Sequence, residues 1–143
     1  SSVLLAAAFL TACSPAKEPE PVVEAAPPAP SIADFAGNWS SSATLAGVTA
    51  PVPSTMMITA DGMNSTISLD QRPNVAATIS MSGDSLVAVT AEYESVLRKG
   101  VMVTTRTASV LVDGKMMGNL IATYRTPKGP EVVMGTIVGT RAP

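Results

Sequence analysis

The sequence predicts an all-β fold in which roughly eight antiparallel strands form a single barrel, with an open β-sandwich of the same strands as the alternative. Three observations predict this fold. Val, Ile and Thr are abundant, whereas Lys, Glu, Gln and Leu, the usual residues of amphipathic helices, are sparse. Apolar and polar side chains alternate with a period of two, and turn dipeptides such as Asp-Gly separate the alternating segments. A sheet of this size without covering helices must fold over itself or close.

The alternation is clearest over residues 75–82, where every second side chain is apolar, and it recurs over 65–70. Turn signals fall at 61–62, 82–84, 113–114 and 126–130. The expected strands are therefore 38–46, 54–60, 64–70, 75–82, 85–93, 101–112, 115–126 and 131–141. With Asp113-Gly114 at a hairpin tip, residues 106 and 121 should pair approximately.

Three glycines interrupt the expected strands at Gly118, Gly135 and Gly139. Glycine inside a strand pattern is typical of a bulge or a tight bend. We therefore expect the last two strands to bend sharply at a barrel corner.

We expect the N-terminal residues to form a targeting signal and not a part of the folded domain. Residues 3–10 form an uncharged apolar run of signal-peptide length, and a bilayer span needs about 20 residues. Leu10-Thr11-Ala12-Cys13 then resembles the lipobox of bacterial lipoproteins. The resemblance implies a diacylglycerol thioether on Cys13, cleavage before it and fatty acylation (palmitate) of the new terminus. Two or three acyl chains anchor a protein firmly in a membrane.

The anchor residue is followed by a tether. Six of the twelve prolines lie in residues 14–30, so neither a helix nor a sheet can run through this segment. An extended polyproline conformation would span roughly 50 Å. We interpret residues 1–12 as the remainder of a signal peptide, 13–30 as lipidated cysteine and linker, and 31–143 as one β-barrel domain. By resemblance to lipoprotein sorting, Ser14 favours the outer membrane, facing the periplasm.

The start of the domain carries a second resemblance. Gly37-Asn38-Trp39 is similar to the G-x-W that opens the lipocalin and calycin barrels. In that family the Trp of the first strand closes the barrel floor and packs against a basic residue of the last strand. The resemblance implies that Trp39 and Arg141 meet where the barrel closes.

The composition excludes most catalytic chemistry. There is no His, and Cys13 is the single cysteine, so a His or Cys metal site and a Ser-His or Cys-His nucleophile are excluded. Glu92 and Glu94 form a close carboxylate pair, best interpreted as a solvated strand end. The net charge of −2 is dispersed and aromatic residues are few, which is unlike nucleic-acid-binding proteins. We expect no enzyme, no cofactor and no metal.

Two functions remain. The first is a lipid-anchored interaction or accessory protein of the cell envelope, and the alternative is a lipocalin-like carrier of a small apolar ligand in the barrel. Arg106 and Arg125 lie inside expected strands, where they either cover the sheet or, with Tyr124, contact a ligand or an anion. Eight-stranded barrels can be filled or hollow. A hollow interior would favour the carrier, and a filled interior would favour the interaction protein.

Overall fold

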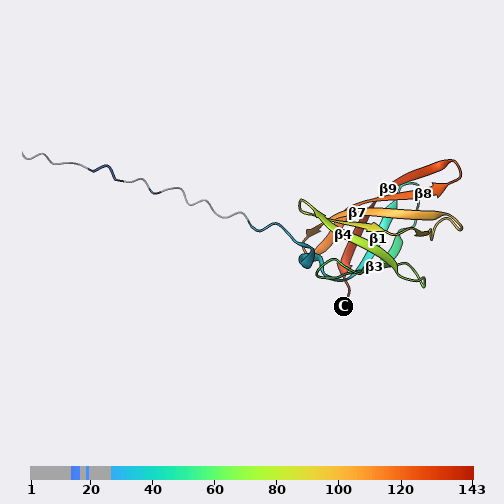
Figure 1. Ribbon diagram of the computed structural model, residues 1–143, viewed down its shortest axis with the longest axis horizontal. Helices are drawn as coiled ribbons and strands as arrows, with labels where there is room; N and C mark the ends of the chain where they lie inside the picture. The colour runs from blue at the N-terminus through green and yellow to red at the C-terminus, as the bar shows by residue number, and fades with distance from the viewer. Residues whose placement is uncertain (1–13, 17–18, 20–26) are drawn as a thin grey trace, which may run out of the picture.

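The computed structural model describes residues 14–16, 19 and 27–143, so Cys13 and the signal-like segment lie outside the described residues. The domain consists of one short 3₁₀ helix, η1 (Ile32–Phe35), and nine strands (Figure 1). The strands are β1 (Gly37–Leu45), β2 (Val52–Ile58), β3 (Ser65–Ser68), β4 (Val75–Ser82), β5 (Ser85–Thr90), β6 (Tyr93–Glu94), β7 (Met102–Val112), β8 (Lys115–Thr126) and β9 (Gly129–Arg141).

The strands close into an antiparallel barrel. Their order is β5-β4-β3-β2-β1-β9-β8-β7-β6, and a ladder between β5 and β7 joins the two sides. The two-residue β6 lies beside the start of β7, so eight longer strands make the wall. The predicted all-β barrel is therefore confirmed, and the open sandwich is excluded by the β1–β9 and β5–β7 ladders.

The hairpin turns explain the register. Asp113 and Gly114 both have positive φ (50° and 76°), the conformation of the two-residue turn that suits the twist of paired strands. The β7–β8 hairpin consequently runs from the Val112–Lys115 pair outward, and Arg106 lies opposite Ile121 as predicted.

One expected strand divides in two. The sequence predicts a continuous strand over 85–93, but β5 ends at Thr90 and β6 begins at Tyr93. The backbone N–H of Ala91 donates to the carbonyl oxygen of Ala76 on β4, so the chain leaves β7 for two residues before it returns.

The interior is packed by alternate side chains of every long strand. The largest fully buried side chains include Trp39, Phe35, Met56, Leu86 and Met116. They come from η1, β1, β2, β5 and β8, and they gather with their neighbours in one cluster. A second cluster around Leu120 and Tyr124 lies between β1, β7, β8 and β9.

Two inward-facing glycines let strands approach closely. A Cβ atom added to Gly118 would lie 2.1 Å from the carbonyl oxygen of Ala108, and one on Gly135 would lie 2.3 Å from that of Thr44. No side chain fits at such distances, so both glycines mark bends of the wall, as expected for a curved sheet.

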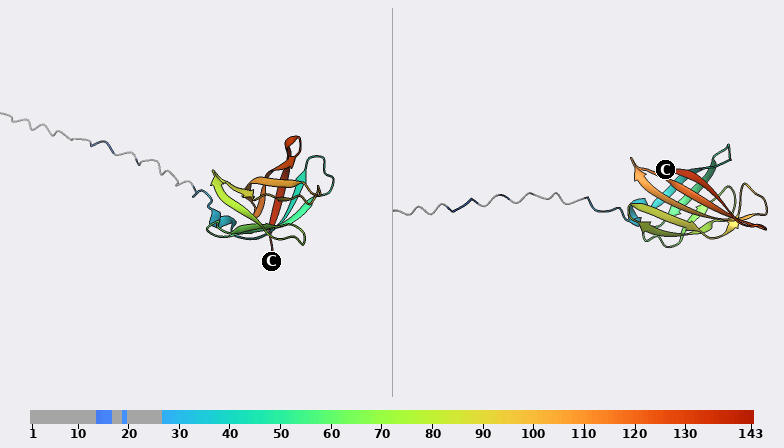
Figure 2. Two further views of the ribbon diagram at one scale, coloured as in Figure 1. Left: turned by 45° about the vertical axis from the view of Figure 1, so that its right-hand side comes forward. Right: turned by 90° about the horizontal axis from the view of Figure 1, so that it is seen from above.

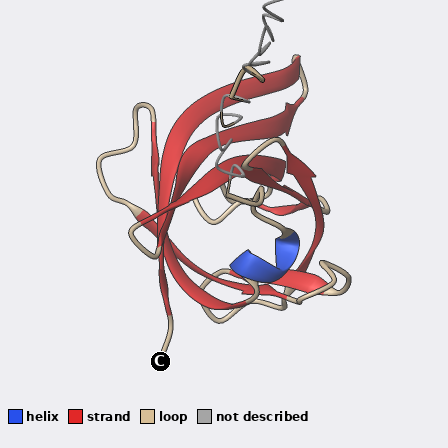
Figure 3. Cartoon of the chain, turned by 90° about the vertical axis from the view of Figure 1, so that its left-hand side faces the viewer, coloured by secondary structure: helices blue, strands red, loops and turns tan. Residues whose placement is uncertain are grey.

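The connections between strands alternate between two ends of the barrel. The 3₁₀ helix, blue in Figure 3, and the connections 59–64, 83–84 and 113–114 lie at one end, which we call the closed end. Connections 46–51, 69–74, 91–101 and 127–128 lie at the other end, which we call the mouth. The chain enters through η1 at the closed end, while the long β8–β9 hairpin projects at the mouth (Figures 1 and 2).

Candidate functional site

The closed end is sealed by Trp39 and Arg141, which pair across β1 and β9. The Trp39 side chain is fully buried, and its indole N–H donates to the Phe35 carbonyl oxygen at 2.8 Å. The Arg141 guanidinium lies 4.4 Å from the indole centroid. It also donates to the carbonyl oxygens of Ala36 and Asp34, at 2.6 and 2.7 Å. The expected contact between Trp39 and Arg141 is therefore present. Its other partners are backbone carbonyl oxygens, so the contact serves to close the barrel.

The interior below the mouth contains a small cavity of about 60 Å³. Apolar side chains such as Leu45, Leu120 and Ile137 line most of it, with the hydroxyls of Thr105 and Thr107 among them. Ligand sites usually occupy about 300–1,000 Å³. The barrel as it stands is therefore filled rather than hollow.

The loop 95–100 lies at the mouth and has a well-defined shape. The hydroxyl oxygen of the buried Ser95 accepts bonds from the N–H groups of Leu97 and Arg98, both at 3.1 Å. The Ser95 N–H donates to the Val101 carbonyl oxygen, and a carboxylate oxygen of Glu94 accepts from the N–H of Gly100 at 2.8 Å. These bonds close the loop on itself, so its tip is held in place without a helix or strand.

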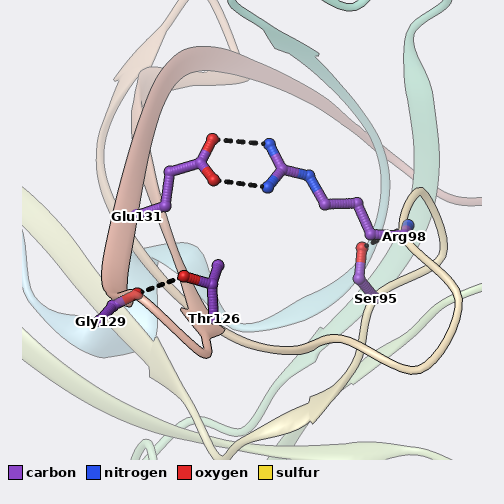
Figure 4. A network of polar contacts seen from close by, with 5 residues as sticks. All are labelled: Ser95, Arg98, Thr126, Gly129 and Glu131. Carbon is purple, nitrogen blue, oxygen red and sulfur yellow. Dashed lines mark hydrogen bonds and ion pairs between the residues drawn. The ribbon is translucent and has the colours of Figure 1, made fainter.

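Arg98 joins this loop to the start of β9 (Figure 4). Its guanidinium donates to both carboxylate oxygens of Glu131, each at 2.9 Å, and lies 4.1 Å from the ring centroid of Tyr124. Tyr124 and Glu131 are paired across β8 and β9, so their side chains leave the sheet on the same side. One planar cation can therefore engage both, and we call Arg98, Tyr124 and Glu131 the latch.

The latch carries opposite charges at neutral pH. The bidentate hydrogen bonds from Arg98 hold the pKa of the Glu131 carboxyl below its ordinary value, and they raise the pKa of Arg98. The pair is therefore charged at all ordinary pH values and weakens only when acid protonates Glu131. Burial raises the pKa of the nearby Tyr93, so its phenol stays neutral.

Two of the open hollows at the mouth are the largest in volume. One, of about 540 Å³, lies between connection 46–49, the latch and Val133. The other, of about 580 Å³, lies between residues 69–76 and 91–94, beside the point where β5 leaves β7. Arg72 crosses its edge and donates to the carbonyl oxygen of Glu94 at 2.6 Å. Both hollows are open to solvent. The outer surface at the mouth is therefore concave in two places, although the interior of the barrel is filled.

The structure brings together two of the three expected ligand contacts, because Tyr124 and Arg125 line one open hollow of about 250 Å³ that does not include Arg106. Tyr124 is buried and lines the interior, but Arg106 and Arg125 lie exposed on the outside of the wall and do not line the interior cavity. They point outward because their neighbours on either side in β7 and β8 face the core. Arg125 instead pairs with Glu92 at 2.6 Å. Both arginines therefore lie on the outer face of the sheet, which is the first of the two positions expected for them.

Sequence reasoning also missed the latch. Arg98 was visible as part of the adjacent basic pair Arg98-Lys99, and Glu131 as an acidic residue at the start of an expected strand. Alternation places Glu131 on the inner face with Val133 and Ile137, which is an unusual position for a carboxylate. That signal could have indicated a partner cation at the mouth.

Among the described residues, no group of three or more His, Cys, Asp and Glu side chains lies close enough to hold a metal ion. No helix in the described ranges is long and apolar enough to cross a membrane. The chain matches no protein-family model, no curated protein and no solved structure.

Proposed function

We propose that this chain is a lipid-anchored accessory protein of the bacterial cell envelope that acts by contacting other molecules through its outer surface. The observation that carries this proposal is the filled interior, whose cavity of about 60 Å³ is too small for a typical ligand. The surfaces left for recognition are the outside of the wall and the mouth. The lipobox-like Leu10-Thr11-Ala12-Cys13 supplies the anchor, and Ser14 favours the outer membrane.

The position of the chain's entry point supports a role in presentation. The described N-terminal residues reach the barrel at the closed end, through η1. The mouth loops lie at the opposite end and are held in shape by the latch. A proline-rich tether of roughly 50 Å would let such a domain reach well beyond the headgroups. No enzymatic step is proposed, and no cofactor or nucleic acid is required.

The anchor is tested by Cys13→Ser in a precursor with a complete signal peptide. The unchanged protein should take up labelled palmitate and sediment with membranes, whereas the variant should take up none and become soluble. Failure of the unchanged precursor to take up fatty acid would contradict the proposal. A matched control, Ser14→Ala, should leave labelling intact.

Recognition through the surface is tested by photocrosslinking in cells. A photoreactive residue at Lys99, exposed on the latch loop, should give discrete crosslinked products. The same residue at Thr78, on the outside of β4, serves as the control position and should give fewer. Identical, diffuse patterns from both positions would argue against a specific partner at the mouth.

The alternative, a carrier of a small apolar ligand, is favoured by the apolar lining of the cavity and by the loop above it. In that function the latch would open to admit the ligand. Arg98→Gln should then increase binding of a fluorescent apolar probe several-fold, and small molecules should co-purify with the protein. A variant that binds no more probe than the unchanged protein would support the surface function.

A further inference from the structure

The outside of the barrel is divided into two walls of different chemistry. On β1–β4 the outward side chains are mostly small hydroxyls, with Met57 as the large apolar exception. On β7–β9 they are mostly large apolar or cationic. We call these outward residues of the last three strands the β7–β9 wall; its larger side chains are Met102, Arg106, Val110, Val112, Lys115, Met117, Ile121, Arg125, Val132, Met134 and Val138.

The apolar side chains of this wall lie in two rows. The cross-strand register puts Val110, Met117 and Val138 in one row and Ile121 beside Met134 in the other, and a row of Ala108, Asn119 and Thr136 lies between them. Met134 and Val132 expose 61% and 58% of their surface, more than any other large apolar residue in the described strands. Several large apolar side chains exposed on one face indicate an interaction site.

The charged part of the wall has one sign. Its ionisable residues are Arg106, Lys115 and Arg125, and none of its outward positions, all of which are described, holds a carboxylate. The chain as a whole has a net charge of −2, so this wall is positively charged on a protein whose net charge is negative. Arg125 is paired with Glu92, whereas Arg106 and Lys115 extend into solvent.

We propose that the β7–β9 wall rests on a phospholipid bilayer with anionic headgroups. Apolar side chains flanked by Lys and Arg are the pattern of protein surfaces that lie in a membrane interface. A second copy of the chain fits less well, because a two-fold contact would bring the cations of both copies together. The inference rests on the proposed lipid anchor, which keeps the wall near a bilayer, so that even a weak contact is populated.

The test uses the full chain with Cys13→Ser, so that no acyl chain contributes. Co-sedimentation is measured with vesicles of phosphatidylcholine alone and with vesicles in which one-third of the lipid is phosphatidylglycerol. Binding is expected to the anionic vesicles at low salt, and it should be lost at 1 M salt, where the Debye length is about 3 Å. Arg106→Gln should weaken it about fivefold.

The apolar contribution is tested with matched methionines. Met134→Ser in the wall should weaken vesicle binding about fivefold or more, whereas Met57→Ser, on the hydroxyl-rich β2, should not. Both methionines are exposed, so circular dichroism should show the same fold in each variant. Equal binding of the two variants, or no binding to anionic vesicles, would overturn the inference.

Self-association is the remaining outcome. Light scattering of the Cys13→Ser chain should show a monomer. A dimer that Met134→Ser dissociates would overturn the inference in favour of a second copy. None of these measurements needs lipidation, so a failure here leaves the anchor untouched, and a failed palmitate labelling leaves the vesicle result standing.

Discussion

Replacing Trp39 by alanine tests how the barrel is closed. The indole is fully buried at the floor of the barrel, so its removal leaves a large cavity and should lower the free energy of unfolding by about 3–5 kcal/mol. The Phe35 carbonyl oxygen also loses its donor. Since domains of this size have about 5–15 kcal/mol in total, the variant should unfold under mild conditions.

Arg141→Ala should cost less, about 1–2 kcal/mol, because the guanidinium is exposed although it donates two charge-assisted bonds to Asp34 and Ala36. Its position over the indole couples it to Trp39 by about 0.5–1 kcal/mol. The double variant should therefore be less destabilised than the sum of the single variants by that amount.

Urea unfolding followed by far-ultraviolet circular dichroism measures all three variants. Fluorescence does not serve, because Trp39 is the single tryptophan. Arg106→Ala, an exposed arginine on the outer wall, is the matched control and should change stability by at most about 0.5 kcal/mol. Additivity of the two single effects to within about 0.3 kcal/mol would refute the coupling of first and last strands through this pair.

Three further outcomes are expected. Deletion of residues 19–30 should leave the melting temperature of the barrel nearly unchanged, because this segment has no core-forming pattern; a drop of several degrees in calorimetry would show that it packs on the domain. Gly118→Ala should destabilise the barrel by about 1–3 kcal/mol in urea unfolding, because the added Cβ would overlap the neighbouring strand, whereas the outward Asn119→Ala should have little effect. The latch should open in acid. The pKa of Glu131 is lowered in the folded chain, so the contact is fully present above the ordinary glutamate pKa of about 4.3 and is lost as the pH falls through the lowered value. Hydrogen exchange of loop 95–100 should rise over that range, and a Glu131→Gln variant, whose exchange is already fast, should show no such step.

The local features of the barrel could be predicted from the sequence because they depend on neighbouring residues. Period-two alternation located the long strands, and Asp113-Gly114 set the register that places Arg106 opposite Ile121. The turn at 127–128 is shorter than the Pro- and Gly-rich sequence suggests, so β9 begins at Gly129 rather than at residue 131. Alternation alone could not decide whether β9 begins at Gly129 or at residue 131. Proline is common in turns, but Pro130 can also adopt the extended conformation of a strand.

The non-local features could not be predicted in the same way. The latch joins Arg98 to Glu131, 33 positions further along the chain. Neither local sequence contains a pattern that identifies the other residue as its partner. The division of the strand over 85–93 depends on a bond between Ala91 and Ala76 on a different strand. Trp39 and Arg141 could be paired in advance only because a family resemblance supplied the partner.

The closure of the barrel also constrains when the chain can fold. Arg141 donates to Ala36, which lies 105 positions earlier, and β1 finds one of its two neighbours only in the last strand. Contacts of such long range form slowly. During synthesis, β1 must therefore wait with one unpaired edge until the final residues emerge. A chain that stops before β9 would expose the edges of both β1 and β8, and such edges invite pairing with other chains. The last thirteen residues of the sheet thus protect the nascent protein from aggregation as well as completing its wall.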